Sequence, residues 1–393
     1  MNTLLPQLSH LKPEILHEKY VLVRAGINVP LANGKVTDSF RIKKALQTIR
    51  FLKKAGARVI IIAHIGRDSK ESLLPVARYM NTKTRIGFAP DVFGEATESM
   101  IDNMKNGTAL MLENLRQYEE EKGNNIAFAK KIAGYADIYV NDAFSVSHRA
   151  HASIVSIPKY LPSYIGLSFE EEYAELERMC HPKKPFVLVL GGAKMKTKLP
   201  LLKAYVRKGD TVCVGGAIAN TLLRARGYEI GKSVADEPKG LGALAKSKHI
   251  LLPKDVVVKT KEGIQVVRGV HDIQKTDTIF DIGPDTISSW EEVLRKAKSV
   301  VVNGPLGWYE KGYTKGTKDI LKIIAQGSAR SVVGGGDTVA LVRSAKMTQD
   351  ITFLSTAGGA MLDYLADGSL PGIEAIRSEK YAYSMNHARP KEK

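Results

Sequence analysis

The sequence predicts an α/β protein with two doubly wound parallel-sheet domains joined by a hinge helix. Short apolar segments rich in β-branched residues alternate along the chain with segments of helical periodicity, a pattern typical of parallel sheets covered by helices on both faces. The 393 residues exceed what one hydrophobic core usually supports. A charged segment also separates two series of strand-like segments. Together these observations predict two domains.

The first series of predicted strands occupies the N-terminal part of the chain. Between its first two strands, apolar residues recur at helical spacing from Ile42 to Leu52, and the chain then breaks at Gly56. The predicted strands are residues 21–23, 59–62, 109–112 and 138–140.

The second series of predicted strands begins after a charged helical segment, residues 168–177, which is followed by Pro182. Such a polar helix suits a connection between two globular units better than a core. The predicted strands are residues 186–190, 211–214, 278–280, 300–302, 331–333 and 351–354. The expected organisation is an N-terminal domain over 1–165, a hinge helix and linker over 166–183, a C-terminal domain over 184–370, and a segment over 371–393 that returns to the N-terminal domain.

The composition indicates a protein that attracts anions. Lys and Arg total 58 against 41 Asp and Glu, a formal net charge of +17. The basic residues are spread along the chain rather than clustered with aromatic residues, which argues against nucleic acid as the partner. The sequence contains no apolar stretch long enough to span a membrane, no signal-like start, and only two cysteines. We therefore expect a cytoplasmic protein with no membrane partner.

Basic and amide side chains follow the predicted strands of the N-terminal half, where α/β sheets bind their ligands. Arginine suits bidentate recognition of carboxylate and phosphate, and histidine can donate beside it. The pattern predicts a site for a small, multiply charged anion. His148 and His151 are three residues apart, but no third ligand accompanies them, so we expect no protein-ligated metal. The candidates are Arg24, Asn28, Arg41, His64, Arg67, Arg116, His148, Arg149 and His151.

Glycine-rich loops follow the predicted strands of the C-terminal half. Glycines let the backbone approach a phosphate, a following helix offers free N–H groups, and lysines neutralise charge. Five such loops after strands of one sheet predict a nucleotide site. They are residues 191–198, 215–217, 303–307, 334–338 and 355–360.

Two nucleotide-binding motifs are excluded. Residues 227–233 are one residue short of a phosphate-binding loop and follow a helical pattern, so we predict a helix C-terminus and a turn there. No G-x-G-x-x-G motif follows the first strand of either half, which argues against dinucleotide binding and hydride transfer.

The ordered set of motifs closely resembles the phosphoglycerate kinase family, from Val21 to about Ile376. The resemblance implies reversible phosphoryl transfer from 1,3-bisphosphoglycerate to MgADP, giving 3-phosphoglycerate and MgATP. It also implies a monomer in which hinge closure brings the two substrates together. The most specific segments are residues 64–67, 141–151, 191–198, 303–305, 334–338 and 370–372.

The resemblance also implies roles for individual residues. Arg41, Lys194 and Lys198 are implied as catalytic, Glu310 as the ribose ligand, and Asp337 as the residue near Mg²⁺. The implied acid site contains Asn28, Arg41, His64, Arg67, Arg116 and Arg149, with Arg24, Gly26, His148 and His151 around them. The implied nucleotide site contains Gly192, Lys194, Lys198, Gly215, Gly216, Asn303, Pro305, Gly307, Glu310, Gly335, Gly336, Asp337 and Thr338.

One departure from the family pattern concerns the acid site. The family usually has an Asp two residues before Asn28, where this chain has Gly26. Loss of that acceptor is expected to weaken binding of the acid by about 1–3 kcal/mol. The main alternative function is therefore a nucleotide-binding protein of the same fold with impaired catalysis. A nucleic-acid binder and a kinase for another small molecule are further alternatives.

Overall fold

The computed structural model describes residues 5–66 and 70–378 and contains two compact units. Unit 1 comprises Met1–Ala174 and Ser369–Lys393, and unit 2 comprises Glu175–Gly368. Each unit contains a six-stranded parallel sheet, so the predicted fold class of two parallel-sheet α/β domains is confirmed. Arg67 and residues 379–393, for which predictions were made, lie outside the described residues.

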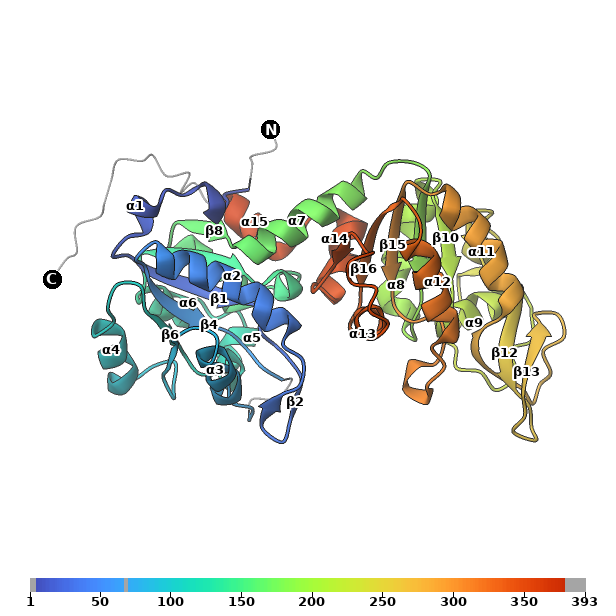
Figure 1. Cartoon of the computed structure of the whole chain (residues 1–393), viewed down its shortest axis with the longest axis horizontal. Coiled ribbons are helices and arrows are strands. Elements are labelled where there is room, and N and C mark those ends of the chain that lie inside the picture. The colour runs from blue at the N-terminus through green and yellow to red at the C-terminus, as the bar shows by residue number, and fades with distance from the viewer. Residues whose placement is uncertain (1–4, 67–69, 379–393) are drawn as a thin grey trace. The chain divides into compact units, whose positions relative to one another are not determined.

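The sheet of unit 1 has the strand order β5-β6-β4-β1-β7-β8, and all its neighbouring strands are parallel (Figure 1). Every crossover between these strands passes through helical or loop segments, as parallel pairing requires. The strands are β1 (Tyr20–Ala25), β4 (Arg58–Ile62), β5 (Gly87–Phe88), β6 (Ala109–Met111), β7 (Ile138–Asp142) and β8 (Ser163–Ile165).

Alternating residues of these strands build two separate cores in unit 1. Val21 and Val23 pack on one face with the apolar residues of α2 and α3, whereas Leu22 packs on the other face with α6. This follows from the two-residue period of a strand. Because both faces are covered, most residues of these strands are apolar, and the exceptions, such as Arg24, Arg58 and Asp142, stand at or next to a strand end. The helices of unit 1 are α1 (Pro13–Leu16), α2 (Phe40–Lys54), α3 (Leu74–Asn81), α4 (Glu95–Asp102), α5 (Glu119–Lys122), α6 (Ile126–Ala133) and α15 (Pro371–Ser378).

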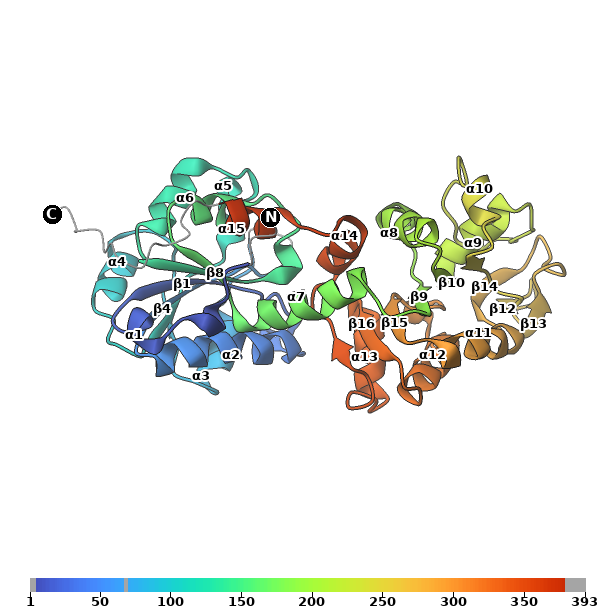
Figure 2. The ribbon, with the colours of Figure 1, turned by 90° about the horizontal axis from the view of Figure 1, so that it is seen from above.

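The main sheet of unit 2 has the order β11-β10-β9-β15-β16-β17, again with parallel neighbours. Figure 2 shows α8 and α14 on one side of this sheet and α11, α12 and α13 on the other. Its strands are β9 (Phe186–Leu190), β10 (Thr211–Val214), β11 (Ile250–Leu251), β15 (Ser299–Asn303), β16 (Arg330–Gly334) and β17 (Phe353–Leu354). Its helices are α8 (Met195–Arg207), α9 (Gly216–Ala225), α10 (Gly242–Ala245), α11 (Pro284–Lys296), α12 (Lys315–Ala325), α13 (Gly336–Ser344) and α14 (Gly359–Asp367).

One predicted strand of unit 2 lies in a different sheet. Residues 278–280 belong to β14 (Thr278–Ile282), which pairs antiparallel with β12 (Asp255–Lys259). β12 also pairs with β13 (Gln265–Gly269), so the three strands form a small antiparallel sheet. The prediction that 278–280 continues the parallel series was wrong because the sequence analysis missed the β12–β13 hairpin that this strand joins.

The charged segment predicted as a helix is α7 (Leu167–Cys180), and the boundary between the units falls within it, after Ala174. Its first turn begins in unit 1, where Asp142 at the end of β7 accepts hydrogen bonds from Ser168 N, Ser168 Oγ and Phe169 N at 3.0, 2.7 and 3.1 Å. The residues predicted to form a helix C-terminus and a turn do so, since α9 ends at Ala225 and Gly227 has φ +90°. Within the described residues, every helix is too short or too polar to cross a bilayer.

Candidate active site

The basic residues of unit 1 gather at one edge of its sheet. They lie at the end of β1 or after β1, β4, β6 and β7, which are four neighbouring strands in the order β6-β4-β1-β7. Parallel strands end on the same edge, so the loops after them are brought together although they are far apart in sequence. Arg116 lies in the 3₁₀ turn η2 (Leu115–Gln117), and Arg41 lies in the first turn of α2.

Asn28 links the loops after β1 and β4. Its side-chain oxygen accepts a hydrogen bond from Gly66 N at 3.1 Å, and its backbone oxygen accepts one from the Arg41 guanidinium at 3.2 Å. The carbonyl of Gly66 accepts a hydrogen bond from Arg116. These contacts join Asn28, Arg41 and Arg116 around one short stretch of backbone.

Arg24 and His64 form the buried part of this site. Arg24 is 1% exposed and His64 is 3% exposed. The Arg24 guanidinium donates to His64 Nδ1 at 2.9 Å, to Ser153 Oγ at 2.9 Å and to Ala25 O at 2.8 Å. All three nitrogens of Arg24 therefore face protein groups, and it supports the site from behind.

His64 and His151 are kept neutral by burial and, to a smaller extent, by the surrounding cations. Burial, followed by the charges of Arg24 and Arg116, lowers the pKa of His64 well below its usual value. Burial, followed by Arg24 and Arg149, lowers the pKa of His151 to about 4. Arg149 donates to His148 Nε2 at 3.2 Å. A site that depresses the pKa of its own bases in this way favours a bound anion.

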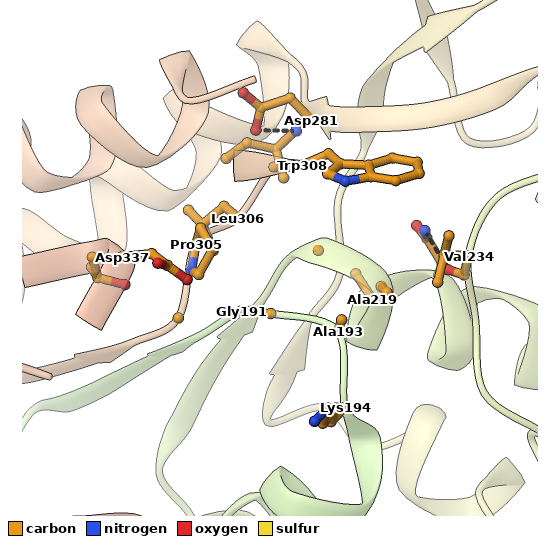
Figure 3. Close-up of a pocket in the computed structure, with 18 of the residues that line it drawn as sticks. Gly191, Ala193, Lys194, Ala219, Val234, Asp281, Pro305, Leu306, Trp308 and Asp337 are labelled. Carbon is orange, nitrogen blue, oxygen red and sulfur yellow. Dashed lines mark hydrogen bonds between the residues drawn. The ribbon is translucent and has the colours of Figure 1, made fainter. Parts of the chain in front are cut away.

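Glycine loops of unit 2 line a pocket of about 470 Å³. The loops after β9 and β15 are in direct backbone contact, as a Cβ on Gly191 would lie 2.2 Å from Pro305 O, and a Cβ on Gly304 would lie 2.4 Å from Gly191 O. Figure 3 shows Gly191 and Pro305 side by side at the wall of this pocket. Any side chain at these glycines would push the loops apart, and Gly304 also has φ +92°.

Helix N-termini supply donors around this pocket. α13 begins after Gly335 and α9 begins after Gly215, and neither helix has a side-chain cap. Both helices therefore offer a positive dipole end to phosphate oxygens. In α9, however, Gly216 N already donates to Leu306 O at 2.8 Å and Ile218 N to Gly192 O at 3.3 Å. α8 differs, because Met195 N donates to Asp236 Oδ2 at 2.8 Å.

Lys198 is the buried cation of this pocket. Its ammonium donates to the side-chain oxygen of Asn303, at the end of β15. Burial lowers the pKa of Lys198 to about 8. Lys194, at the N-terminus of α8, also lines the pocket (Figure 3). The arrangement can neutralise a phosphate from two sides.

The polar groups at the start of α13 suit a hydrated Mg²⁺ delivered with a nucleotide. Asp337 lines the pocket, and burial and then the charge of Glu310 raise its pKa. The hydroxyl of Thr338 is buried and has no hydrogen-bond partner among the described groups. Within the described part of the chain, no cluster of three or more His, Cys, Asp or Glu could bind a metal ion. Mg²⁺ commonly needs only one or two carboxylates when phosphates supply the remaining ligands, and Asp337 fits that role.

The apolar wall of the pocket was missed by the sequence analysis. Trp308 and Val234 lie toward the same end of the pocket in Figure 3, away from Asp337. The Trp308 ring stacks on Phe280 at 5.4 Å between centroids and an interplanar angle of 21°. Trp308 follows a glycine of a predicted phosphate loop, which was a usable signal, but the remaining apolar residues resemble core residues. They include Ala219, Pro253, Val256 and Ile279.

Most of the residues predicted for the nucleotide site line this one pocket. Gly215 is the exception, since it caps α9 and packs against Leu306. In unit 1, Gly26 lies between Arg24 and Asn28, and a Cβ added there would lie 3.2 Å from Asp142 O. The lining residues that were predicted are Gly192, Lys194, Lys198, Gly216, Asn303, Pro305, Gly307, Glu310, Gly335, Gly336, Asp337 and Thr338.

A cationic site and a glycine-lined phosphate pocket, each at the carboxyl edge of a parallel sheet, define a nucleotide-dependent phosphotransferase. The model of the family described as "Phosphoglycerate kinase" matches residues 12–368 of this chain. The chain therefore belongs to the phosphoglycerate kinase family.

Relatives and solved structures agree with this assignment. The chain is 41% identical to the phosphoglycerate kinase of Coprothermobacter proteolyticus over 389 residues, which cover 94% of this chain and 99% of the relative. It is 39% identical to the enzyme of Dictyoglomus turgidum, covering 94% and 98% of the two chains. Structures of phosphoglycerate kinase from Coxiella burnetii and Pyrococcus horikoshii align with TM-scores of 0.82 and 0.86 at 35% and 31% identity, each covering 95% of this chain and 98% of the other.

Proposed function

We propose that this chain catalyses reversible phosphoryl transfer from 1,3-bisphosphoglycerate to MgADP, giving 3-phosphoglycerate and MgATP. It is a phosphotransferase with a carboxyl group as acceptor and acts in glycolysis. The observation that carries the proposal is the extent of the family match, because residues 12–368 include both the cationic site and the glycine-lined pocket.

The cationic site of unit 1 is proposed to bind the triose acid. Arg41, Arg116 and Arg149 offer guanidinium groups for phosphate and carboxylate, and Asn28 positions the loop between them. Neutral His64 and His151 donate without adding charge. Arg67 belongs to this proposal by family resemblance.

The pocket of unit 2 is proposed to bind the nucleotide. The adenine and ribose would lie against the apolar wall and Glu310, and the phosphates against the glycine loops, Lys194 and Lys198. In the direction of ATP synthesis, an oxygen of the ADP β-phosphate attacks the acyl phosphorus, and the bond from phosphorus to the carboxyl oxygen breaks as the carboxylate leaves. Both attacking groups, phosphate and carboxylate, are already ionised, so no general base is needed.

Charge neutralisation is then the main catalytic contribution of the protein. The proposed catalytic residues are Lys198, Lys194 and Arg41, which would balance charge on the transferring phosphoryl group. Mg²⁺ bound with the nucleotide would neutralise further phosphate charge, with Asp337 and Thr338 beside it. Asp337 must be ionised for this role, and a nearby cation would oppose the rise in its pKa caused by burial.

Further properties implied by the family belong to the same proposal. Since the two sites lie in different units, transfer requires hinge closure, with α7 and the chain near residue 370 as the hinges. Closure would also exclude water that hydrolyses the acyl phosphate. We propose a monomer that acts in the cytoplasm and binds neither nucleic acid nor membranes.

The proposal is tested by initial rates with 3-phosphoglycerate and MgATP, with acyl-phosphate formation coupled to NADH consumption. Turnover that requires 3-phosphoglycerate, ATP and Mg²⁺ together would support it. Omission of the acid or replacement by 2-phosphoglycerate serves as the control for acceptor identity.

A second candidate function is a nucleotide-binding protein with impaired catalysis, which is favoured by Gly26 in the acid site. Folded protein that binds MgATP but gives no turnover would select this alternative. Turnover at a normal rate would exclude it and make Gly26 a tolerated variation.

A further inference from the structure

Glu121 is a buried carboxylate next to the acid site that the proposed mechanism does not use. It lies in the short helix α5, after β6, and is 1% exposed. Its neighbours Glu119 and Glu120 in the same helix are exposed. A carboxylate is rarely fully buried without a partner of opposite charge, so we expect a cationic partner near Glu121.

The partner is Arg24, reached through Ser153. The two oxygens of Glu121 accept from Ser153 N at 2.9 Å and from Ser153 Oγ at 2.6 Å. Since the single hydroxyl proton of Ser153 goes to Glu121, the hydroxyl oxygen is free to accept from Arg24 Nε at 2.9 Å. The charge of Glu121 is also the largest electrostatic influence that favours the charged form of Arg24. The direction of every hydrogen bond in this chain is therefore fixed.

The other end of Arg24 fixes the protonation of His64. A guanidinium has only donors, so His64 Nδ1, 2.9 Å from Arg24 Nη2, must accept. The ring proton then resides on Nε2, which becomes a donor. The arginine charges that act on His64 are those of Arg24, Arg116 and Arg149, all of them from the acid site. An Nε2–H donor is the form that suits a phosphate or carboxylate in such a site.

We propose that Glu121 is a positioning residue of the acid site, which acts through Ser153 and Arg24 to hold His64 as the neutral Nε2–H tautomer. Burial and the neighbouring arginines disfavour the imidazolium, and Arg24 excludes the Nδ1–H form. Glu121 balances the buried charge of Arg24, so the guanidinium stays in place when the site is empty. The inference rests on the proposed function, because it assigns the His64 donor to the triose acid.

His151 also lies near Glu121, but it serves a different purpose. Its Nδ1 is 3.9 Å from Glu121 Oε1, a separation at which an ion pair would form only if His151 were protonated. Its pKa of about 4 leaves the ring neutral near pH 7. Glu121 therefore acts mainly on Arg24 in the free protein.

The first test is the tautomer of His64 in the unmodified full-length protein, read from two-bond ¹H–¹⁵N correlations of the imidazole near neutral pH. His64→Gln identifies the signal. We expect the Nε2–H form. An Nδ1–H ring or an imidazolium would overturn the proposal, and this result does not depend on whether 3-phosphoglycerate is a substrate.

The second test uses Glu121→Gln and Ser153→Ala, with Glu120→Gln as the matched exposed control. We expect both buried variants to mix the His64 tautomers and to raise KM for 3-phosphoglycerate by about tenfold, as for loss of one charge-assisted hydrogen bond. KM for MgATP should stay unchanged in both variants, and Glu120→Gln should behave like wild type. If Glu121→Gln does not fold, Ser153→Ala and the wild-type tautomer still decide the question.

Two outcomes of these experiments separate the positioning role from the proposed function. A folded Glu121→Gln protein with an unchanged His64 tautomer and unchanged KM would remove the positioning role. A wild-type protein with the expected tautomer but no turnover of 3-phosphoglycerate would contradict the proposed function and leave the hydrogen-bond chain intact.

Discussion

Lys198 donates from its ammonium to the side-chain oxygen of Asn303, and this contact holds a buried cation at the end of β15. The same lysine lines the glycine pocket, where a nucleotide phosphate would bind. Asn303 is neutral, so the charge of Lys198 is oriented by this contact but is not cancelled. A phosphate oxygen would thus be its first full countercharge.

Replacement of Lys198 by Ala should abolish most turnover while the fold is retained. Removal of one preorganised charge that stabilises a transition state typically lowers kcat by about 10²–10³-fold. Steady-state kinetics and circular dichroism measure the two quantities. Lys203→Ala, at an exposed position of the same helix α8, is the control and should behave like wild type. Full activity in Lys198→Ala would remove this residue from the mechanism.

The pH dependence of kcat/KM for the nucleotide should reflect the ionisation of the Lys198 ammonium. Burial lowers its pKa to about 8, so the ammonium is lost from the free protein as the pH rises through 8. We expect kcat/KM to fall above about pH 8 with a slope of one proton. In the complex, bound phosphate favours the charged form, so the corresponding limb of kcat should lie at higher pH. Lys198→Arg should shift the kcat/KM limb upward, since arginine stays protonated; an unmoved limb would assign it to another group.

The parallel sheets and the glycine loops could be predicted because their physical signals are local. Strands covered on both faces are largely apolar, as β9 is throughout and β4 is after Arg58, and this pattern is visible in the sequence. Gly191 and Gly304 are required where two backbone segments are in contact, and a glycine directly after a strand indicates such a contact. The glycine loops that line the pocket of unit 2 could therefore be predicted from the sequence.

The residues that the sequence analysis missed depend on contacts between distant segments. β12 and β13 form a hairpin around Gly263, and the partly exposed β13, which contains Gln265 and Arg268, lacks the apolar pattern of a buried strand. Trp308 and Val234 became pocket residues only when their loops met. Arg24 was predicted as a ligand because it follows a strand, yet its guanidinium faces Ser153 and His64. Sequence position cannot tell a side chain that faces a ligand from one that supports it.

Asp142 should make the stability of the protein depend on pH. Burial raises the pKa of this carboxyl to about 7, above its usual value of 3.8. Between about pH 4 and pH 7 the folded protein therefore holds a proton that the unfolded chain has released. The contribution of protonated Asp142 to stability is complete below pH 4 and is lost as the pH rises through 7. Over this range the free energy of unfolding should fall by up to about 1.4 kcal/mol per pH unit.

Asp142→Asn should flatten this slope and keep the contacts with Ser168 and Phe169, since an amide oxygen can accept the same hydrogen bonds. Urea unfolding at several pH values between 4 and 8 measures the effect. Asp137→Asn is the control, because Asp137 is half-buried beside the opposite end of β7 and accepts from Tyr20 N. Equal slopes in wild type and Asp142→Asn would contradict the assignment.

Gly26→Asp should strengthen binding of the triose acid. Gly26 lies between Arg24 and Asn28, and its φ is outside the left-handed region, so a side chain is compatible with the local backbone. An added Cβ would lie 3.2 Å from Asp142 O and 3.4 Å from Ala143 Cα, which requires the end of β7 to shift by a few tenths of an ångström. The new carboxylate would supply the acceptor that the family usually provides for the substrate hydroxyl. One such hydrogen bond should lower KM for 3-phosphoglycerate about two- to tenfold.

Gly26→Ala separates the carboxylate from the steric effect, because it adds the same Cβ without an acceptor. We expect Gly26→Ala to leave KM unchanged or to raise it, since the Cβ presses on the end of β7 and brings no new contact. Kinetics of the two variants with 3-phosphoglycerate and with MgATP measure the comparison. A KM for the acid that falls only in Gly26→Asp would identify Gly26 as a position that sets affinity. Equal changes in both variants would mean that the backbone shift, and not the missing carboxylate, controls binding at this loop.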